Sequence, residues 1–214
     1  MRLFCLLPLF FALLPLRLWA FQGREPTAPH LPTAVALEYY ARAGDQMERL
    51  LWDWSDCQFI ANGRELSWQR RGDRTVILWE GDELPFPTDP LDTKPLAVDL
   101  PIAPFDLLCP FFSWPEPTYD GPGKMVGRRV QRFSVKNPDG ANSPIAEVKI
   151  WLDASYCYPL AWEAIGRDGR PLRRFQLRSL KKSSDGHWTV RSLEFSMPQE
   201  RKTVRVVVPD GAGT

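Results

Sequence analysis

The sequence has little of the chemistry on which most enzymes depend. It contains two histidines, His30 and His187, and four cysteines without a C-x-x-C pair. It has no G-x-S-x-G, H-E-x-x-H, EF-hand or dinucleotide-binding signature. The segment GPGKM at 121–125 lacks the leading glycine and the final Ser or Thr of a phosphate-binding loop. We therefore expect no catalytic residue, no metal site and no cofactor, and we predict that the protein is not an enzyme.

An excess of charge of one sign is also missing. The 27 basic residues face 26 acidic ones, for a net charge of +1. This balance gives no general attraction to nucleic acid, so no nucleic-acid partner is expected. Four basic pairs stand out: Arg70-Arg71, Arg128-Arg129, Arg173-Arg174 and Lys181-Lys182. Because neighbours on a strand point to opposite faces, we interpret most of these pairs as solvated edges or rims. The alternative is a basic rim around an apolar sheet that attracts an anionic headgroup or an acidic partner.

The apolar run Leu3–Leu16 is shorter than the about 20 residues that span a bilayer. It follows the cationic start Met1-Arg2 and precedes a small residue, Ala20, as in a secretory signal peptide. We predict a signal peptide at 1–20 and a periplasmic protein after its removal. The alternative is an uncleaved anchor in the inner membrane. Residues 21–32 carry three prolines and are expected to form an extended tether. Residues 33–214 would then form a single domain.

Cleavage after Ala20 would leave Cys57, Cys109 and Cys157. Three cysteines in an exported protein allow one disulfide and one free thiol, or no disulfide at all. Burial of all three as free thiols is the simpler interpretation.

Two kinds of periodicity divide the domain. After Thr33, apolar residues recur at helical spacing and predict an amphipathic helix over 34–51. From residue 57 onward the period changes to two, which is typical of β-strands. A short helix is expected at Phe105–Phe112, after a proline-rich irregular stretch over 81–102. Strands are predicted at 64–71, 74–80, 127–136, 145–153, 158–168, 170–182, 187–198 and 201–209. Short turns between them indicate an antiparallel meander of about seven to ten strands.

The predicted strands have one apolar and one charged face. The charged faces carry Lys149, Glu163, Arg174, Arg178 and Glu194. All but one of the nine tryptophans lie beyond residue 20, and a sheet this rich in aromatic side chains can form a packed core or a hydrophobic cavity. Alternation places six large side chains on the apolar faces, and we hypothesise that they line one concavity: Trp68, Phe133, Ile150, Trp162, Phe175 and Phe195.

The order of short motifs in the second half resembles that of the bacterial outer-membrane lipoprotein-sorting protein family, which includes the periplasmic lipoprotein carriers. These motifs are Trp151 with Asp153, Pro159-Leu160, Asp168-Gly169, Lys181-Lys182, Trp188 and Lys202-Thr203. The resemblance spans about residues 33 to 208.

The resemblance implies a mainly β (α+β) fold, in which a curved antiparallel sheet forms an incomplete half-barrel. An N-terminal helix and a short helical lid would cover its concave apolar face. The lid would consist of Phe105, Leu108, Phe111, Phe112 and Trp114. The implied function is binding or carriage of lipoprotein acyl chains, or of another lipid-like ligand, with an envelope protein as a possible partner. The alternative is a structural or protein-interaction module whose core is filled by its own side chains. A void of several hundred Å³ would favour a ligand.

Overall fold

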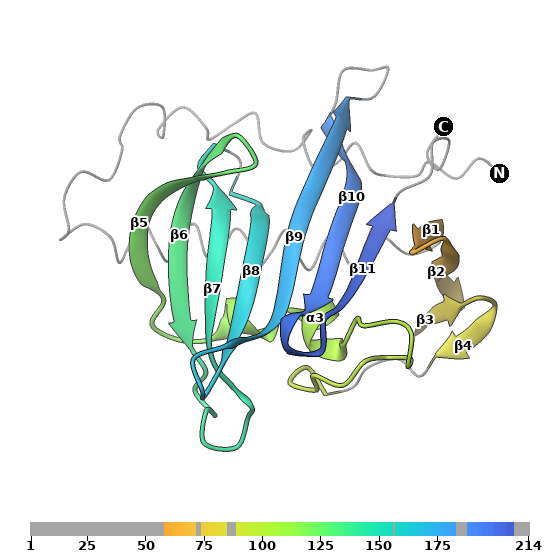
Figure 1. The fold of residues 1–214 in the computed structure, drawn as a ribbon, viewed down its shortest axis with the longest axis horizontal. Coiled ribbons are helices and arrows are strands. Elements are labelled where there is room, and N and C mark those ends of the chain that lie inside the picture. The colour runs from red at the N-terminus through yellow and green to blue at the C-terminus, as the bar shows by residue number, and fades with distance from the viewer. Residues whose placement is uncertain (1–57, 72–73, 85–88, 156, 183–187, 208–214) are drawn as a thin grey trace.

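The protein is described by a computed structural model over residues 58–71, 74–84, 89–155, 157–182 and 188–207. These residues build one antiparallel sheet of eleven strands, which curves without closing into a barrel (Figure 1). The fold class expected from the sequence is therefore confirmed. The predicted helix at 34–51, the signal peptide at 1–20 and the tether at 21–32 lie outside the described residues.

The sheet consists of two meanders that meet in its interior. The first contains β1 (Gln58–Ala61), β2 (Arg64–Arg71), β3 (Arg74–Trp79) and β4 (Asp82–Leu84). The second contains β5 (Thr118–Met125), β6 (Arg128–Lys136), β7 (Ile145–Asp153), β8 (Pro159–Gly166), β9 (Pro171–Lys182), β10 (Trp188–Met197) and β11 (Lys202–Val207). The first strand pairs with the last, since Ile60 lies opposite Val207 and Ala61 opposite Val206. The order is thus β4-β3-β2-β1-β11-β10-β9-β8-β7-β6-β5.

Three of these strands were not expected: β1, β4 and β5. The sheet therefore exceeds the predicted upper limit of ten strands. β5 was read as a turn because it contains Gly121, Pro122 and Gly123. It lies at one edge of the sheet and pairs only with β6 among the described strands. A proline is tolerated there because its missing N–H can face away from the ladder.

The expected single helix at Phe105–Phe112 is in fact two short helices. Helix α3 spans Pro104–Leu108, and the 3₁₀ helix η2 spans Pro110–Ser113. Cys109 between them has a left-handed backbone with φ of 44°. Pro110 lacks the N–H that would continue α3, so the chain turns and starts a new helix. Another 3₁₀ helix, η3, spans Pro198–Glu200.

The two faces of the sheet differ as predicted. On the charged face, Arg178 makes a bidentate pair with Glu194, and Arg174 pairs with Glu163. The opposite face carries the hydrophobic core, onto which the segment with α3 and η2 packs. Figure 1 shows this segment crossing the lower part of the sheet.

Two of the three cysteines can be placed. Cys109 and Cys157 are buried and neither forms a disulfide, as the simpler interpretation expected, whereas Cys57 lies outside the described residues. In the part of the chain that the structure describes, no helix is both long and apolar enough to cross a membrane.

Candidate functional site

Five of the six residues predicted to line a concavity lie side by side in one line across the sheet. Phe133 pairs with Ile150, Ile150 with Trp162, Trp162 with Phe175, and Phe175 with Phe195. We call Phe133, Ile150, Trp162, Phe175 and Phe195 the cross-strand row. With adjacent strands about 4.8 Å apart, the row is roughly 19 Å long. All five side chains are buried.

The sixth residue, Trp68, lies on β2 opposite Ile77 of β3. Two strands, β1 and β11, separate β2 from β10, so Trp68 is not adjacent to the row along the sheet.

Aromatic side chains of α3 and η2 pack directly on the middle of the row. We call residues 100–114 the cover segment. The ring centroids of Phe105 and Phe111 lie 5.7 and 5.4 Å from that of Trp162. Trp114 contacts both phenylalanines, with centroid separations of 6.4 Å. The cover segment therefore lies over the cross-strand row.

The five predicted lid residues are not equally deep. Phe105, Phe111 and Trp114 are buried, whereas Leu108 and Phe112 are half-buried. Phe112 still packs against Phe111, with ring centroids 4.6 Å apart.

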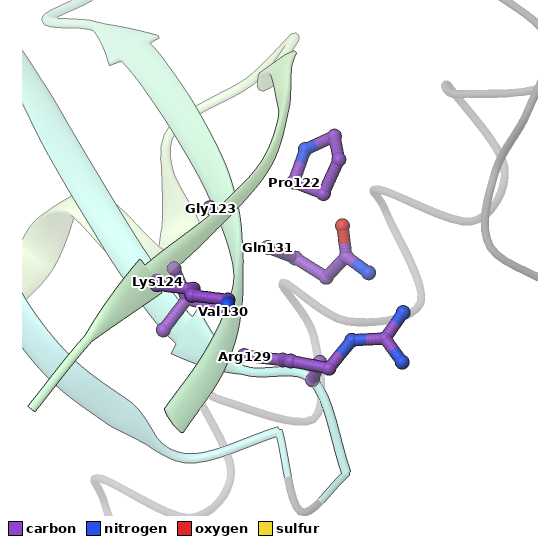
Figure 2. A pocket seen from close by; sticks show the side chains of 7 residues that line it. Pro122, Gly123, Lys124, Arg129, Val130 and Gln131 are labelled. Atoms are coloured by element: carbon purple, nitrogen blue, oxygen red, sulfur yellow. The ribbon is translucent and has the colours of Figure 1, made fainter. Parts of the chain in front are cut away.

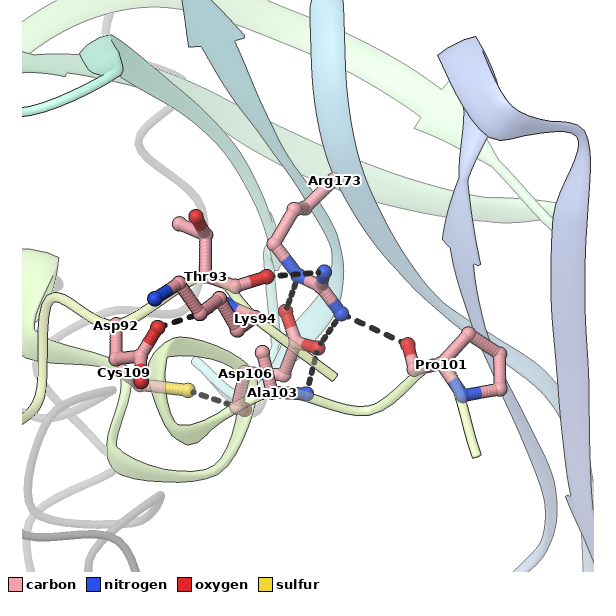
Figure 3. A network of polar contacts seen from close by, with 8 residues as sticks. All are labelled: Asp92, Thr93, Lys94, Pro101, Ala103, Asp106, Cys109 and Arg173. Atoms are coloured by element: carbon pink, nitrogen blue, oxygen red, sulfur yellow. Dashed lines mark hydrogen bonds and ion pairs between the residues drawn. The ribbon is translucent and has the colours of Figure 1, made fainter. Parts of the chain in front are cut away.

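A buried ion pair also fastens the cover segment to the sheet (Figure 3). The guanidinium of Arg173 on β9 forms a two-point pair with the carboxylate of Asp106 on α3, with Nε 2.7 Å from Oδ1. Arg173 also donates to the carbonyl oxygens of Thr93 (3.0 Å) and Pro101 (2.7 Å). Both ionic side chains are almost fully buried. We call this network the Arg173 latch.

Asp106 serves the cover segment in a second way. One of its oxygens, Oδ2, accepts a hydrogen bond from the Ala103 N–H at the start of α3, at 2.8 Å. Burial raises the pKa of Asp106 above its usual value, against the charge and hydrogen bonds of Arg173 and the Ala103 N–H. The nearby Cys109 thiol donates a hydrogen bond to the backbone carbonyl of Asp106. Burial raises the pKa of the Cys109 thiol well above the usual range.

The latch is an exception to the prediction that most of the basic pairs are solvated edges or rims. Arg174 is indeed exposed, but Arg173 faces the core. The signal was present in the sequence, because Arg173 shares its strand face with Phe175 and Leu177 at a spacing of two. Arg128 is also engaged, in an ion pair with the buried carboxylate of Asp153.

One polar atom in the aromatic cluster has no partner. The indole Nε1 of Trp162 is buried, and no acceptor lies within hydrogen-bond reach among the described residues. Trp162 itself is 0% exposed, between Phe105, Phe111 and Phe175. A buried donor without an acceptor is uncommon in folded proteins.

An open hollow of about 510 Å³ lies between the last residues of β5 and the first of β6. Its lining consists of Pro122, Gly123, Lys124, Arg129, Val130, Gln131 and Ala154. Figure 2 shows Pro122, Gln131 and Arg129 projecting on the same side of the two strands. The sequence did not predict this hollow. Among the described residues, no group of His, Cys, Asp or Glu side chains could hold a metal ion.

No protein-family profile matches the chain, and no curated protein matches it by sequence. Solved structures do share its fold. One is a DUF1329 family protein from Desulfovibrio piger, with 14% identity, a TM-score of 0.57, and coverage of 84% of this chain and 92% of the other. Another is a domain from Vibrio parahaemolyticus described as an outer membrane lipoprotein-sorting protein, with 13% identity, a TM-score of 0.52, and coverage of 79% and 92%.

At these identities the likeness concerns the fold alone. A LolA superfamily protein from Nitrosomonas europaea is also similar, with 11% identity, a TM-score of 0.49, and coverage of 81% and 90%. The Desulfovibrio piger and Vibrio parahaemolyticus structures agree with the curved antiparallel sheet that the motif order implied.

Proposed function

We propose that this protein is a non-enzymatic, exported binding protein that holds an acyl chain, of a lipoprotein or of another lipid-like ligand, on the cross-strand row. The signal-like residues 1–20 support a periplasmic location, with an envelope protein as donor or acceptor of the ligand. The description of the Vibrio parahaemolyticus domain as a lipoprotein-sorting protein agrees with such a role.

The observation that favours a ligand is the unpaired indole N–H of Trp162. A buried donor without an acceptor costs about 1–3 kcal/mol of stability. A core filled only by the protein's own side chains would gain nothing in return for this cost. The donor lies at the middle of the row, under the cover segment. The carbonyl oxygen of an acyl group between the row and the cover segment would give it an acceptor.

The alternative is a structural or protein-interaction module. It is favoured by the tight packing of Phe105 and Phe111 on Trp162, since the described cover segment already fills this part of the face. Under the first function, the cover segment must move aside when the ligand enters. Under the second, it stays in place.

Mass spectrometry of lipids that co-purify with the full chain tests the proposal. We expect acylated species on the wild type. Phe175→Ala widens the row next to Trp162 and should shift the chain lengths retained. Gln176→Ala is the matched control, because this neighbour faces the other side of β9 and should leave the retained species unchanged.

If the folded wild type retains no acylated species, the carrier function is wrong and the self-filled module is favoured. If lipids are bound but Phe175→Ala and Gln176→Ala carry the same species, the ligand lies elsewhere than on the row.

A further inference from the structure

A buried cation lies beside the middle of the cross-strand row. Arg173 is 1% exposed and lies two residues before Phe175 on β9, so the two side chains share a face. Trp162 lies opposite Phe175, which makes Trp162 and Arg173 diagonal neighbours. Diagonal neighbours on adjacent strands lie about 7–8 Å apart, within reach of long side chains. One small polar group on this face can therefore contact both the guanidinium and the indole N–H.

The cover segment presents to these two side chains the two parts of a fatty acid. Phe105 and Asp106 are consecutive residues of α3. The ring of Phe105 packs on Trp162, with centroids 5.7 Å apart. The carboxylate of Asp106 forms the two-point pair with Arg173 (Figure 3). An apolar group thus lies on the indole, and a carboxylate lies next to it on the guanidinium.

Stability alone does not account for the buried ion pair. Replacing such a pair by apolar side chains of similar volume is often neutral or stabilising, because both ions lose their water. Phe105, Phe111 and Trp114 already attach the cover segment to the core through apolar contacts. The pair does impose a condition on a ligand. When the cover segment moves off the row, Asp106 leaves with it, and a chain that then covers the row would bury Arg173 without a counter-charge.

We propose that Arg173 exchanges the carboxylate of Asp106 for the carboxylate of a fatty acid whose chain lies on the cross-strand row. In the closed protein Asp106 neutralises the guanidinium, and in the loaded protein the ligand does so. The indole N–H of Trp162 donates to the same carboxylate, so the acyl carbonyl and the charged head are one group. This inference rests on the proposed function and narrows its ligand from any acyl-bearing molecule to one with a free carboxylate.

The exchange selects ligands by their charge. A fatty acid leaves the guanidinium paired, since one carboxylate replaces another. A fatty alcohol of the same length carries no charge, and its chain would cover an unpaired guanidinium. That state is costly, because arginine keeps its proton and a buried charge needs a partner. The site should therefore prefer a carboxylate over a neutral amphiphile.

Three probes separate the carboxylate from the chain: decanoate has both, 1-decanol has the chain alone, and acetate has the carboxylate alone. Each is titrated into the full chain by isothermal titration calorimetry at about pH 8, well above the pKa of a carboxylic acid. We expect decanoate to bind the wild type at least about tenfold more tightly than decanol, as hydrogen bonds to a charged group would give.

Two variants of the Arg173 latch should respond in opposite ways. Asp106→Ala removes the competing carboxylate, so decanoate should bind it at least about tenfold more tightly than the wild type. Decanoate should also raise the thermal midpoint of Asp106→Ala more than decanol does, a rescue that a purely structural ion pair would not give. Arg173→Met should bind decanoate no more tightly than decanol.

The matched control is Arg174→Met, on the charged face of β9, which should keep the wild-type preference for decanoate. Circular dichroism melting curves give the thermal midpoints and verify that all proteins are folded. The comparison of the probes on the wild type does not depend on any variant.

Equal binding of decanoate and decanol by the wild type, without rescue of Asp106→Ala, would overturn this inference and leave the proposed function in place. A preference for decanoate that persists in Arg173→Met would also overturn it, since the carboxylate would then bind elsewhere. A wild type that binds neither decanoate nor decanol would overturn both this inference and the proposed function. Rescue of Asp106→Ala by acetate would in that case identify a site for small anions.

Discussion

Asp106→Ala should be the most destabilising single change in the Arg173 latch. It leaves the Arg173 guanidinium buried, with the carbonyls of Thr93 and Pro101 as acceptors and no counter-charge. An arginine cannot give up its proton to escape this situation. Breaking a buried pair in this way costs about 3–5 kcal/mol. Loss of the bond from the Ala103 N–H adds about 1 kcal/mol.

Arg173→Met should cost less, about 2 kcal/mol, because the isolated carboxyl of Asp106 can take up a proton. The double variant should cost less than the sum of the two by at least about 2 kcal/mol, since no charge then remains buried. Urea unfolding followed by far-ultraviolet circular dichroism gives these free energies.

The matched control is Arg174→Met, which breaks the partly exposed pair with Glu163 one residue along β9. Its cost should stay below about 1 kcal/mol, as for other surface pairs. If Asp106→Ala and Arg174→Met cost the same, or if the two latch variants are additive, the latch does not hold the cover segment as argued.

Two further predictions concern single residues. Because burial raises the pKa of Cys109, iodoacetamide at pH 8 should modify this thiol only after urea unfolding, as peptide mass spectrometry would reveal; rapid modification of the folded protein would show that the cover segment opens readily. Val126 is 52% exposed and has a left-handed φ of 50° in the β5–β6 turn, so Val126→Asn should stabilise the protein by about 1 kcal/mol, raising the thermal midpoint. The control Val98→Asn, at a residue 91% exposed without a positive φ, should have no effect, and an equal effect of the two would contradict the turn argument.

The fold could be predicted where apolar and polar residues alternate along a strand and a short turn leads to the next strand. Hairpins such as β8–β9 place their strands through short turns, and the cross-strand row follows from the alternation once these turns fix the register. The pairing of β1 with β11 could not be predicted in this way, because nothing local joins Ile60 to Val207. β5 was missed because the sequence Gly121-Pro122-Gly123 argues against a β-strand, and such residues are tolerated only in an edge strand.

The candidate site was predicted only in its apolar part. Large side chains at a spacing of two identify the core face, so the alternation alone places the five residues of the row on that face. The burial of Arg173 could have been predicted from its spacing of two to Phe175 and Leu177, but nothing local in the sequence pairs Arg173 with Asp106. The hollow depends on the Lys124–Arg129 register, and this in turn depends on recognising β5 as a strand.

Under the proposed function, the free energy needed to open the cover segment would limit the ligands that the cross-strand row could take. Moving it off the row would expose Phe105, Phe111 and Trp114 together with the rings beneath them. At about 1.5–3 kcal/mol for each large side chain returned to water, the three cover residues alone contribute roughly 5–9 kcal/mol against opening. A ligand shifts this equilibrium only by its differential affinity for the open state, so it must cover a comparable apolar area itself. A small polar molecule cannot do so, whereas a chain extended along the roughly 19 Å of the row can.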